Sequence, residues 1–370
     1  MQSIAHFTIP QITDITDPAI TAQLQHALDQ KTKPQGSLGR LEALALRLGQ
    51  ILGSTVPALQ QPQMLVCAGD HGLAARGVSA FPADVTWQMV HNFLAGGAAV
   101  SVLARQHGLA LTVVDCGVAR AVEPPAAATP AAVQEQPTSP PRLLQRRVAA
   151  GTQDASCGPA MAPEQCAQAL ANGQEVVRGL PGNVLLLGEM GIGNTSVASL
   201  LLARLGGVDL AACTGAGTGL DVAGVARKRA VLQQALQANA QATSPLQALA
   251  ALGGFEVATL VGAVLQAAVE RRVIVVDGFI SSAAMFLASR LQPAVLQRCV
   301  FAHRSGEPGH ALMLAQMQAE PLLDWGLRLG EGSGAALAWP LLVSACAILR
   351  EMASFEAAGV AGRVDCSPGN

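Results

Sequence analysis

The 370-residue sequence contains no tyrosine, and phenylalanine and tryptophan together make up only 3% of it. Aromatic side chains form the platforms on which single-stranded nucleic acids stack, so their scarcity argues against such a binding surface. Charged residues are also scarce, at 13%, and 23 basic against 25 acidic residues give a formal net charge of −2. This balance argues against a basic nucleic-acid coat and a polybasic membrane binder. An anionic ligand would therefore be bound locally, by helix ends and a few basic side chains.

Zinc, disulfide and targeting signals are missing as well. The eight cysteines form no C-x-x-C pair and no Cys/His cluster with zinc spacing, and several lie inside apolar runs. We therefore expect reduced core thiols in a cytoplasmic protein. Residues 1–20 lack the apolar core of a signal peptide. The longest weakly charged run, residues 248–269, carries Glu256 near its centre and has no comparable second run. It therefore favours a buried helix over a membrane span.

Apolar residues are abundant, at 51%, and 38 glycines accompany them. A chain of this length and composition can bury a large core, and its length predicts two domains or one large domain with an appendage. Short β-rich runs alternate with long helical patterns. These runs lie at residues 64–68, 111–115, 184–187, 273–276 and 299–302. Continuous apolar strands separated by helices predict an α/β fold, a Rossmann-like, doubly wound parallel sheet covered on both faces.

Both ends of the chain are helical in pattern. We expect residues 1–60 and 320–370 to form a small helical subdomain beside a large domain of residues 61–319. In the first segment, leucines from position 38 to 48 share one face behind Ser37, the expected N-cap. In the last, Pro340 is expected to break the helix. Residues 119–147 are rich in alanine and proline, which predicts a solvent-exposed excursion without chemistry of its own.

Polar residues and glycines follow all five predicted strands. The endings read Gly69-Asp70-His71, Asp115-Cys116-Gly117, Gly188-Glu189-Met190-Gly191, Asp277-Gly278 and His303-Arg304-Ser305-Gly306. In open α/β sheets, ligands bind beyond the carboxyl ends of the strands. Turn formation alone explains one such ending, but five together favour a binding site at this edge of the sheet.

Three glycine-containing segments are candidates for anion binding. Residues 188–196 (GEMGIGNTS) follow a strand and open a helix, which suits either a phosphate cradle or a plain turn. They match neither the Walker A motif nor the G-x-G-x-x-G fingerprint. A second glycine loop, residues 213–219, precedes Lys228, which either complements an anion or lies on a solvated basic face. Residues 303–310 are the third candidate.

Two further groups bear on chemistry. Glu331 stands between glycines beside an apolar helix, so it is either a base with a raised pKa or an acid that complements the helix dipole. Asp70 and His71 have no third metal ligand at a sensible spacing. We therefore expect them to have a structural or substrate-positioning role, and we predict no metal site.

Six of these segments together resemble one enzyme family. They are residues 33–42 (KPQGSLGRLE), 69–72 (GDHG) with 77–82 (GVSAFP), 189–195 (EMGIGNT), 277–280 (DGFI), 303–305 (HRS) and 328–334 (RLGEGSG). In this order the sequence resembles the nicotinate-nucleotide–dimethylbenzimidazole phosphoribosyltransferases, from about residue 10 to about residue 360. The match is specific because six separate loops agree.

The resemblance implies a reaction and an architecture. The family transfers 5-phosphoribose from nicotinate mononucleotide to 5,6-dimethylbenzimidazole. Its products are nicotinate and α-ribazole 5′-phosphate, the precursor of the lower-ligand nucleotide of cobalamin. Its members are homodimers with a Rossmann-like large domain and a small helical domain, and they need no metal or redox cofactor.

The resemblance also assigns residues. It implies that Glu331 is the general base and that Glu189 and Lys228 bind substrate. It implies a pocket for the incoming base that contains Ser79, Phe81 and Gln88 and is flanked by Leu329. Ser333 stands where the family often has threonine, and residues 119–147 are longer than usual.

The glycine turn itself predicts a phosphate site. We expect the substrate phosphate to bind at the start of the helix, with help from the segment after the last strand. The residues concerned are Gly191, Gly193, Asn194 and Thr195, and then Ser305 and Gly306.

Two alternatives remain beside this interpretation. A non-catalytic nucleotide- or base-binding α/β protein would use the same phosphate site but would not need Glu331. An enzyme that uses NAD or S-adenosylmethionine is disfavoured, because no G-x-G-x-x-G follows a first strand.

Overall fold

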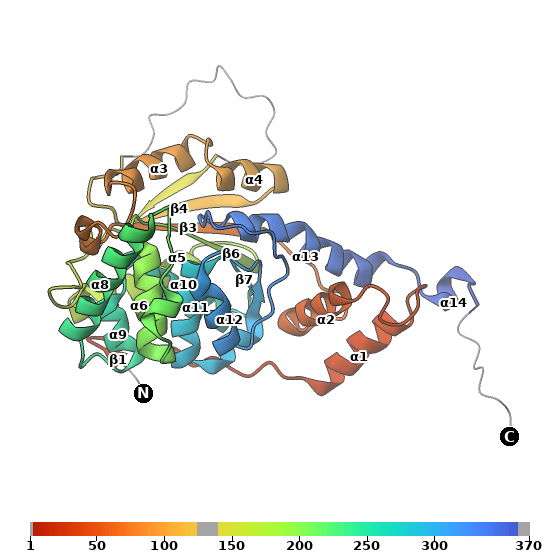
Figure 1. The fold of residues 1–370 in the computed structure, drawn as a ribbon. Coiled ribbons are helices and arrows are strands. Elements are labelled where there is room, and N and C mark those ends of the chain that lie inside the picture. Colours follow the sequence, from red (N-terminus) through yellow and green to blue (C-terminus); the bar gives the residue numbers. More distant parts are fainter. Residues whose placement is uncertain (1–2, 124–139, 362–370) are drawn as a thin grey trace, which may run out of the picture. The chain divides into compact units, whose positions relative to one another are not determined.

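The structure, a computed structural model, describes residues 3–123 and 140–361 (Figure 1). It divides into two compact units, each formed from two stretches of chain. The first contains the described residues of 1–13 and 60–338, and the second contains those of 14–59 and 339–370.

A six-stranded parallel sheet organises the first unit. In spatial order its strands are β5 (Arg142–Gln145), β4 (Ala110–Gly117), β3 (Gln63–Gly69), β6 (Val184–Met190), β7 (Val273–Val276) and β8 (Cys299–Phe301). The chain winds outward in one direction from β3 and in the other from β6. The predicted doubly wound α/β sheet is therefore confirmed. The switch point between β3 and β6 is where such folds bind ligands.

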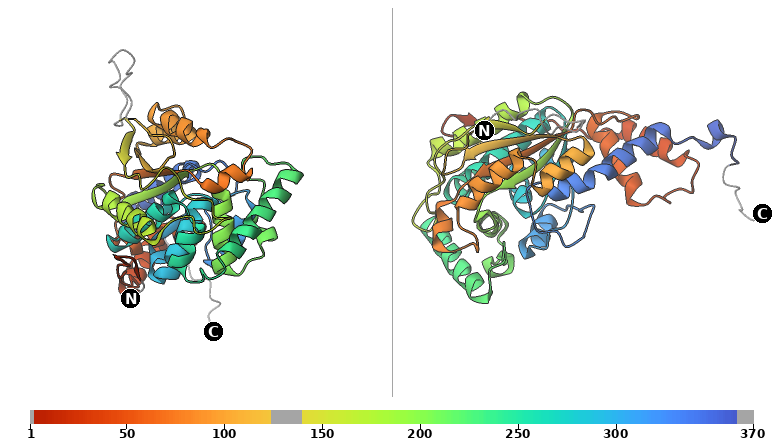
Figure 2. Two further views of the ribbon diagram at one scale, coloured as in Figure 1. Left: turned by 90° about the vertical axis from the view of Figure 1, so that its left-hand side faces the viewer. Right: turned by 90° about the horizontal axis from the view of Figure 1, so that it is seen from above.

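Helices cover both faces of this sheet (Figures 1 and 2). On one face lie α3 (Asp84–Leu94) and α4 (Ala99–His107). On the other lie α6 (Asn194–Gly206), α10 (Phe255–Val269) and α11 (Phe279–Leu291), with α5 (Pro163–Arg178) packed against α10. The unit also contains α7 (Leu210–Cys213), α8 (Val222–Ala238), α9 (Pro245–Leu252), α12 (Pro308–Gln316), the start of α13 (Ser333–Glu351) and the 3-10 helices η1 (Gly72–Arg76) and η2 (Pro293–Arg298).

The strands that the sequence predicted are buried on both faces, which is why they read as continuous apolar runs. Every residue of β3, β6, β7 and β8 is buried. The sequence missed β5, whose residues are exposed or partly buried. Both ends of this strand are polar and exposed, so its Arg-Leu-Leu-Gln pattern lacks the continuous apolar run of the buried strands. It lies within residues 119–147, so that segment is not wholly an excursion; residues 124–139 lie outside the described part.

The unit boundaries differ from the expected ones at both ends. A short hairpin of β1 (Ser3–Ile4) and β2 (Phe7–Thr8) contacts α5, and Phe7 and Ile9 belong to the core of the sheet unit. At the other end, the backbone of Leu323 pairs with that of His303 beside β8. The first residues and residues 320–338 therefore belong to the first unit, because they pack on the sheet core.

The second unit is helical. It contains α1 (Pro18–Asp29), α2 (Arg40–Leu52), the second part of α13 and α14 (Phe355–Ala358). The expectation that Ser37 is the N-cap of α2 is wrong: Gly39 holds that position, with φ 55°. Pro340 does not break the helix either, since α13 continues through it. Proline removes one backbone hydrogen bond from the helix. Ala336 and Leu342 on either side of it are buried, and this packing holds the helix together through Pro340.

The long apolar run is interrupted as its glycines suggest. α9 ends at Leu252, and α10 begins at Phe255, has 15 residues and is buried from Phe255 to Ala268. The predicted buried helix is confirmed. The expectation of no second comparable run is wrong, because α13 is long and apolar enough to cross a membrane by length and composition. Of its most apolar 18-residue stretch, 56% is buried in the protein.

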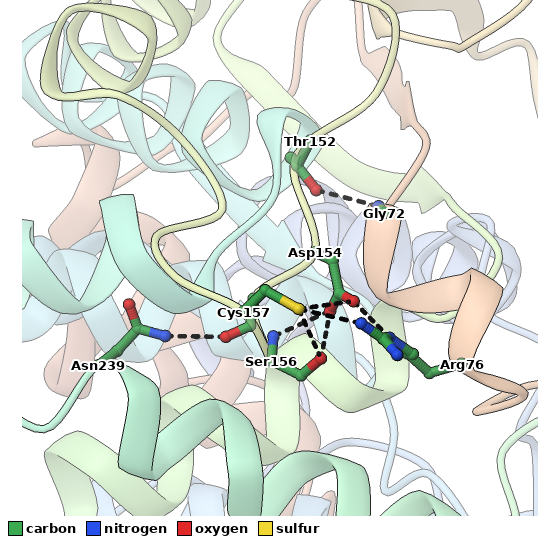
Figure 3. Close-up of polar contacts among 8 residues, drawn as sticks. Gly72, Arg76, Thr152, Asp154, Ser156, Cys157 and Asn239 are labelled. Carbon is green, nitrogen blue, oxygen red and sulfur yellow. Dashed lines mark hydrogen bonds and ion pairs between the residues drawn. The ribbon is translucent and has the colours of Figure 1, made fainter.

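Polar contacts fix the segment that leads into α5 (Figure 3). Arg76 of η1 lies 2.5 Å from the carboxylate of Asp154 and donates to the sulfur of Cys157 at 3.0 Å. Asn239 donates to the carbonyl of Ala155 at 2.9 Å. Cys157 is exposed, so the expectation of core thiols is wrong for this residue. The other six described cysteines are buried.

We predict that Gly262→Ala destabilises the fold. A Cβ at Gly262 of α10 would overlap the backbone carbonyl of Leu170 of α5. Alanine in place of glycine favours an isolated helix by about 1 kcal/mol. Overpacking typically costs about 1–3 kcal/mol and sometimes more, and here the obstacle is backbone. We therefore expect a lower urea midpoint of unfolding. Gly158→Ala is the matched control, because no heavy atom lies within 4 Å of its Cβ position. Equal midpoints for both variants would contradict the close helix packing.

Candidate active site

A pocket lies beyond the carboxyl ends of β6, β7 and β8, as the strand endings predicted. Its lining comes from the segments that follow these strands and from two further loops. The lining residues are 189–192, 194 and 195 at and after the end of β6, 278–280 after β7, 303, 305 and 307 after β8, and 217, 218 and 328–331. Seven of the residues singled out in the sequence are among them. These are Glu189, Gly191, Asn194, Thr195, Ser305, Leu329 and Glu331.

Glu331 enters this pocket from an unusual backbone conformation. Its φ is 65°, in the left-handed region, and its neighbours Gly330 and Gly332 have φ values of 83° and 91°. A side chain is strained at such a φ, so the surrounding structure must hold it there. Glu331 is only 6% exposed, and its Oε2 is buried without a hydrogen-bond partner in the described residues.

Asp277 at the end of β7 holds this segment in place. Its Oδ2 accepts from the amide of Gly332 at 3.1 Å, and its Oδ1 accepts from the amide of Ala335 at 2.9 Å. The same carboxylate lies 3.5 Å from Nε2 of His303, and both side chains are buried. Asp277 therefore satisfies free amides at the start of α13 and fixes the residue beside Glu331.

Burial and nearby acidic groups raise the pKa of both glutamates of the pocket. Burial, and then the charge of Asp277, raise the pKa of Glu331 to about 7. Burial, and then the charges of Asp277 and Glu256, raise the pKa of Glu189 to about 8, although Asn194 donates a hydrogen bond to it. A carboxylate with a pKa near neutrality is suited to accepting a proton during a reaction.

The glycine turn after β6 presents two backbone amides. The amide of Asn194 donates to the carbonyl of Gly191 at 3.0 Å, and that of Ile192 donates to Thr86 Oγ1 at 3.0 Å. The amides of Gly193 and Thr195 have no such acceptor among the described residues. Gly193 is the N-cap of α6, with φ 95°. Of the residues predicted for this turn, Gly193 and Thr195 therefore have amides without an acceptor, at a helix N-terminus that favours an anion. Thr195 lines the pocket, whereas Gly193 lies beside the lining residues Ile192 and Asn194.

Lys228 lies directly behind this turn. It is fully buried, and its Nζ donates to Thr195 Oγ1 at 2.8 Å. Burial lowers its pKa to about 8, against the raising effect of the charge of Glu307. The solvated basic face that the sequence left open is therefore excluded for Lys228, whose ammonium group is instead bonded to Thr195 of the glycine turn.

The segment after β8 contributes less than expected. The amide of Gly306 donates to the carbonyl of Leu327 at 2.9 Å, and that of Ser305 donates to His310 Nδ1 at 2.8 Å. Gly306 does not line the pocket, whereas Ser305 does. From this segment the side chains of His303, Ser305 and Glu307 line the pocket, and of the two residues predicted to help bind the phosphate only Ser305 is among them.

Ser79, Phe81 and Gln88, which were expected to form the pocket for the incoming base, are not among the lining residues. Ser79 Oγ lies 3.2 Å from Thr218 Oγ1, at the rim, and accepts from the amide of Phe81 at 3.2 Å. Phe81 is 50% exposed, and Gln88 is also exposed. The structure therefore brings Ser79 next to the pocket but does not bring these three residues into it.

Sequence reasoning gave no separate role to four polar residues that matter here. Asp277, His303, Glu307 and Arg328 lie at the pocket or hold its wall. Arg328, for example, donates to the carbonyl of Gly217 at 3.4 Å. All four lie in or beside motifs at strand and loop ends, but their roles depend on contacts with residues distant in sequence. No group of three potential metal ligands occurs in residues 3–123 and 140–361.

Comparison with known proteins places the chain in a family. A family model described as "Phosphoribosyltransferase" matches residues 13–360. A protein of Variovorax paradoxus named nicotinate-nucleotide–dimethylbenzimidazole phosphoribosyltransferase is 70% identical, over 95% of this chain and 97% of its own length. A protein of the same name from Cupriavidus necator is 55% identical, over 95% and 98%.

A solved structure supports the same assignment. The enzyme of that name from Thermus thermophilus superimposes with a TM-score of 0.84 at 39% identity, and the match covers 94% of this chain and all of the other. The chain therefore belongs to the nicotinate-nucleotide–dimethylbenzimidazole phosphoribosyltransferase family, as its six motifs predicted.

Proposed function

We propose that the chain transfers 5-phosphoribose from nicotinate mononucleotide to 5,6-dimethylbenzimidazole, releasing nicotinate and forming α-ribazole 5′-phosphate. Glu331 is the general base. The observation that carries this role is the buried, unpartnered carboxyl oxygen of Glu331 in a pocket that also presents a glycine turn. The names of the relatives support the choice of substrates.

The chemistry requires one proton acceptor. The nicotinate ring of the mononucleotide is a pyridinium and leaves as a neutral pyridine, so no acid is needed for its departure. Dimethylbenzimidazole attacks C1′ through its lone-pair nitrogen and would become cationic unless its N–H proton is removed. Glu331 accepts that proton. Attack opposite the leaving group converts the β configuration at C1′ to α.

Binding and positioning account for the rest. The amides of Gly193 and Thr195, the ammonium group of Lys228 and the hydroxyl of Ser305 bind the phosphate. Fixing the phosphate sets the position of C1′ relative to Glu331, and alignment of the reacting atoms contributes directly to the rate. Glu189, which is protonated over much of the neutral range, adds no full negative charge beside the anionic substrate.

We predict that the wild-type chain releases nicotinate only when both substrates are present and that Glu331→Gln lowers turnover. Glutamine keeps the size but cannot accept the proton, and a positioned general base contributes about 10²–10⁴-fold. Glu175→Gln is the control, on an exposed side chain of α5. Nicotinate is measured by chromatography. If Glu331→Gln turns over at the wild-type rate, the base is another group, and Glu189 is the next candidate.

The wild type and Glu331→Gln should also differ in how their turnover depends on pH. In the wild type, turnover should rise as pH increases through about 7, because Glu331 must lose its proton to act as a base. This acid limb should be absent from the residual activity of Glu331→Gln. An unchanged limb in the variant would assign the titration to a different group.

We predict that Gly193→Val raises KM for the mononucleotide by about 10- to 100-fold, the loss of one hydrogen bond to a charged group. A β-branched residue is strained at φ 95°, so the helix start must move. KM for dimethylbenzimidazole should stay the same. Gly158→Val is the control, because the Cβ position there is open. A folded Gly193→Val enzyme with an unchanged KM would remove the phosphate assignment.

We also propose that the chain acts as a homodimer in the cytoplasm. An apolar fraction of 51% and exposed apolar side chains such as Trp325 and Val222 support a further buried surface. Sedimentation equilibrium should give twice the chain mass of 37.7 kDa. A single species of the monomer mass at micromolar concentration would contradict the dimer.

A further inference from the structure

His71 and Glu256 form an ion pair that is closed off from water. Nε2 of His71 lies 2.9 Å from Oε1 of Glu256, and the side chains are 2% and 0% exposed. His71 follows the carboxyl end of β3, and Glu256 lies in the first turn of α10. The two groups are paired by charge, and none of their four polar atoms has a hydrogen-bond partner in the described residues. Each charge therefore depends on the other, since an unpaired charge is costly to bury.

Three glycines from three segments close around this pair. A Cβ at Gly254 would overlap the ring of His71, and one at Gly69 would lie 3.1 Å from Oε2 of Glu256. A Cβ at Gly191 would lie 2.5 Å from the carbonyl oxygen of Gly69 and 3.0 Å from Nε2 of His71. The pair thus fills space that a side chain at each of these positions would need, so glycine lets the three segments approach it closely.

Gly191 connects the pair to the glycine turn. Its carbonyl accepts from the amide of Asn194 at 3.0 Å and so closes the turn that presents Gly193 and Thr195. The next residue, Ile192, donates to Thr86 Oγ1 at 3.0 Å. The turn is therefore held at two places, by the ring of His71 against Gly191 and by the hydroxyl of Thr86.

The surroundings favour the charged form of the pair. Burial lowers the pKa of His71, but the charge of Glu256, the bond to it and the charge of Asp70 raise the pKa above its ordinary value. Glu189 on β6 also faces this cluster, because the charge of Glu256 is among the causes that raise its pKa. Losing the proton of His71 would leave Glu256 unpaired between these acidic groups.

We propose that His71 and Glu256 are positioning residues for the mononucleotide: their ion pair supports Gly191 and thereby sets the amides that receive the phosphate. The inference rests on the proposed function and extends it to a pair that does not itself touch substrate. Without the pair, Gly191 loses the surface on which it rests, and the turn shifts relative to Lys228 and Ser305.

The test uses the full chain with His71→Gln, Glu256→Gln and the two changes combined. His26→Gln is the matched control, on an exposed histidine of α1. We measure dissociation constants for nicotinate mononucleotide and for nicotinate riboside, which lacks the phosphate, and then kcat and both KM values. Circular dichroism and urea unfolding identify the variants that fold.

Each single variant should weaken mononucleotide binding by about 10- to 100-fold. This is the effect of losing one hydrogen bond between a turn amide and the charged phosphate. Binding of the riboside, KM for dimethylbenzimidazole and kcat at saturation should stay near the wild-type values. The double variant should lose less than the two singles combined, because both remove the same interaction. If His71→Gln does not fold, Glu256→Gln keeps the side-chain size, removes the charge that requires His71 and provides the same comparison.

Folded variants that bind the mononucleotide as the wild type does would overturn the proposal. An equal loss for mononucleotide and riboside would also overturn it, since it would show a general loss of structure. A wild-type chain that binds the mononucleotide but does not transfer its phosphoribosyl group would overturn the proposed function alone. The comparison of dissociation constants would then still decide the role of the pair.

Discussion

The bonds from Asp277 to the amides of Gly332 and Ala335 are the contact on which the site depends. They join the end of a central strand to the start of α13 and so hold Glu331 in a conformation that a free chain would leave. The same carboxylate lies against His303 and raises the pKa of Glu331 and Glu189. One side chain thus fixes where the candidate base lies and adds to the effect of burial in raising its pKa.

The site also depends on glycines, which let the backbone approach these side chains closely. Where the sheet edge meets the pocket, backbone approaches side chains so closely that a methyl group has no room: a Cβ at Gly330 would lie 2.5 Å from Oε1 of Glu189. Gly191 and Gly254 are in the same position with respect to His71. The glycine-rich motifs are therefore needed for close packing as well as for turns, and the acidic side chains lie in the space that the glycines leave.

Much of this arrangement could be predicted from the sequence. The five buried strands have an apolar signature because both faces are covered, and the motifs at their ends identify the pocket edge. Glu331 and Lys228 could be singled out by their glycine neighbours and family motifs. What could not be predicted depends on long-range contacts. The role of Asp277 follows from amides on another segment, that of His71 from a carboxylate on α10, and β5 is too polar to stand out.

The crowding of acidic groups has a thermodynamic consequence for substrate binding. Burial raises the pKa of Glu331 to about 7 and that of Glu189 to about 8, and it lowers the pKa of Lys228 to about 8. An arriving phosphate or carboxylate stabilises the protonated form of each, so the mononucleotide binds with net uptake of protons from the buffer. Its affinity must then fall as pH rises through this range, while proton abstraction by Glu331 improves. Substrate affinity and the rate of proton abstraction therefore change in opposite directions when the pH changes.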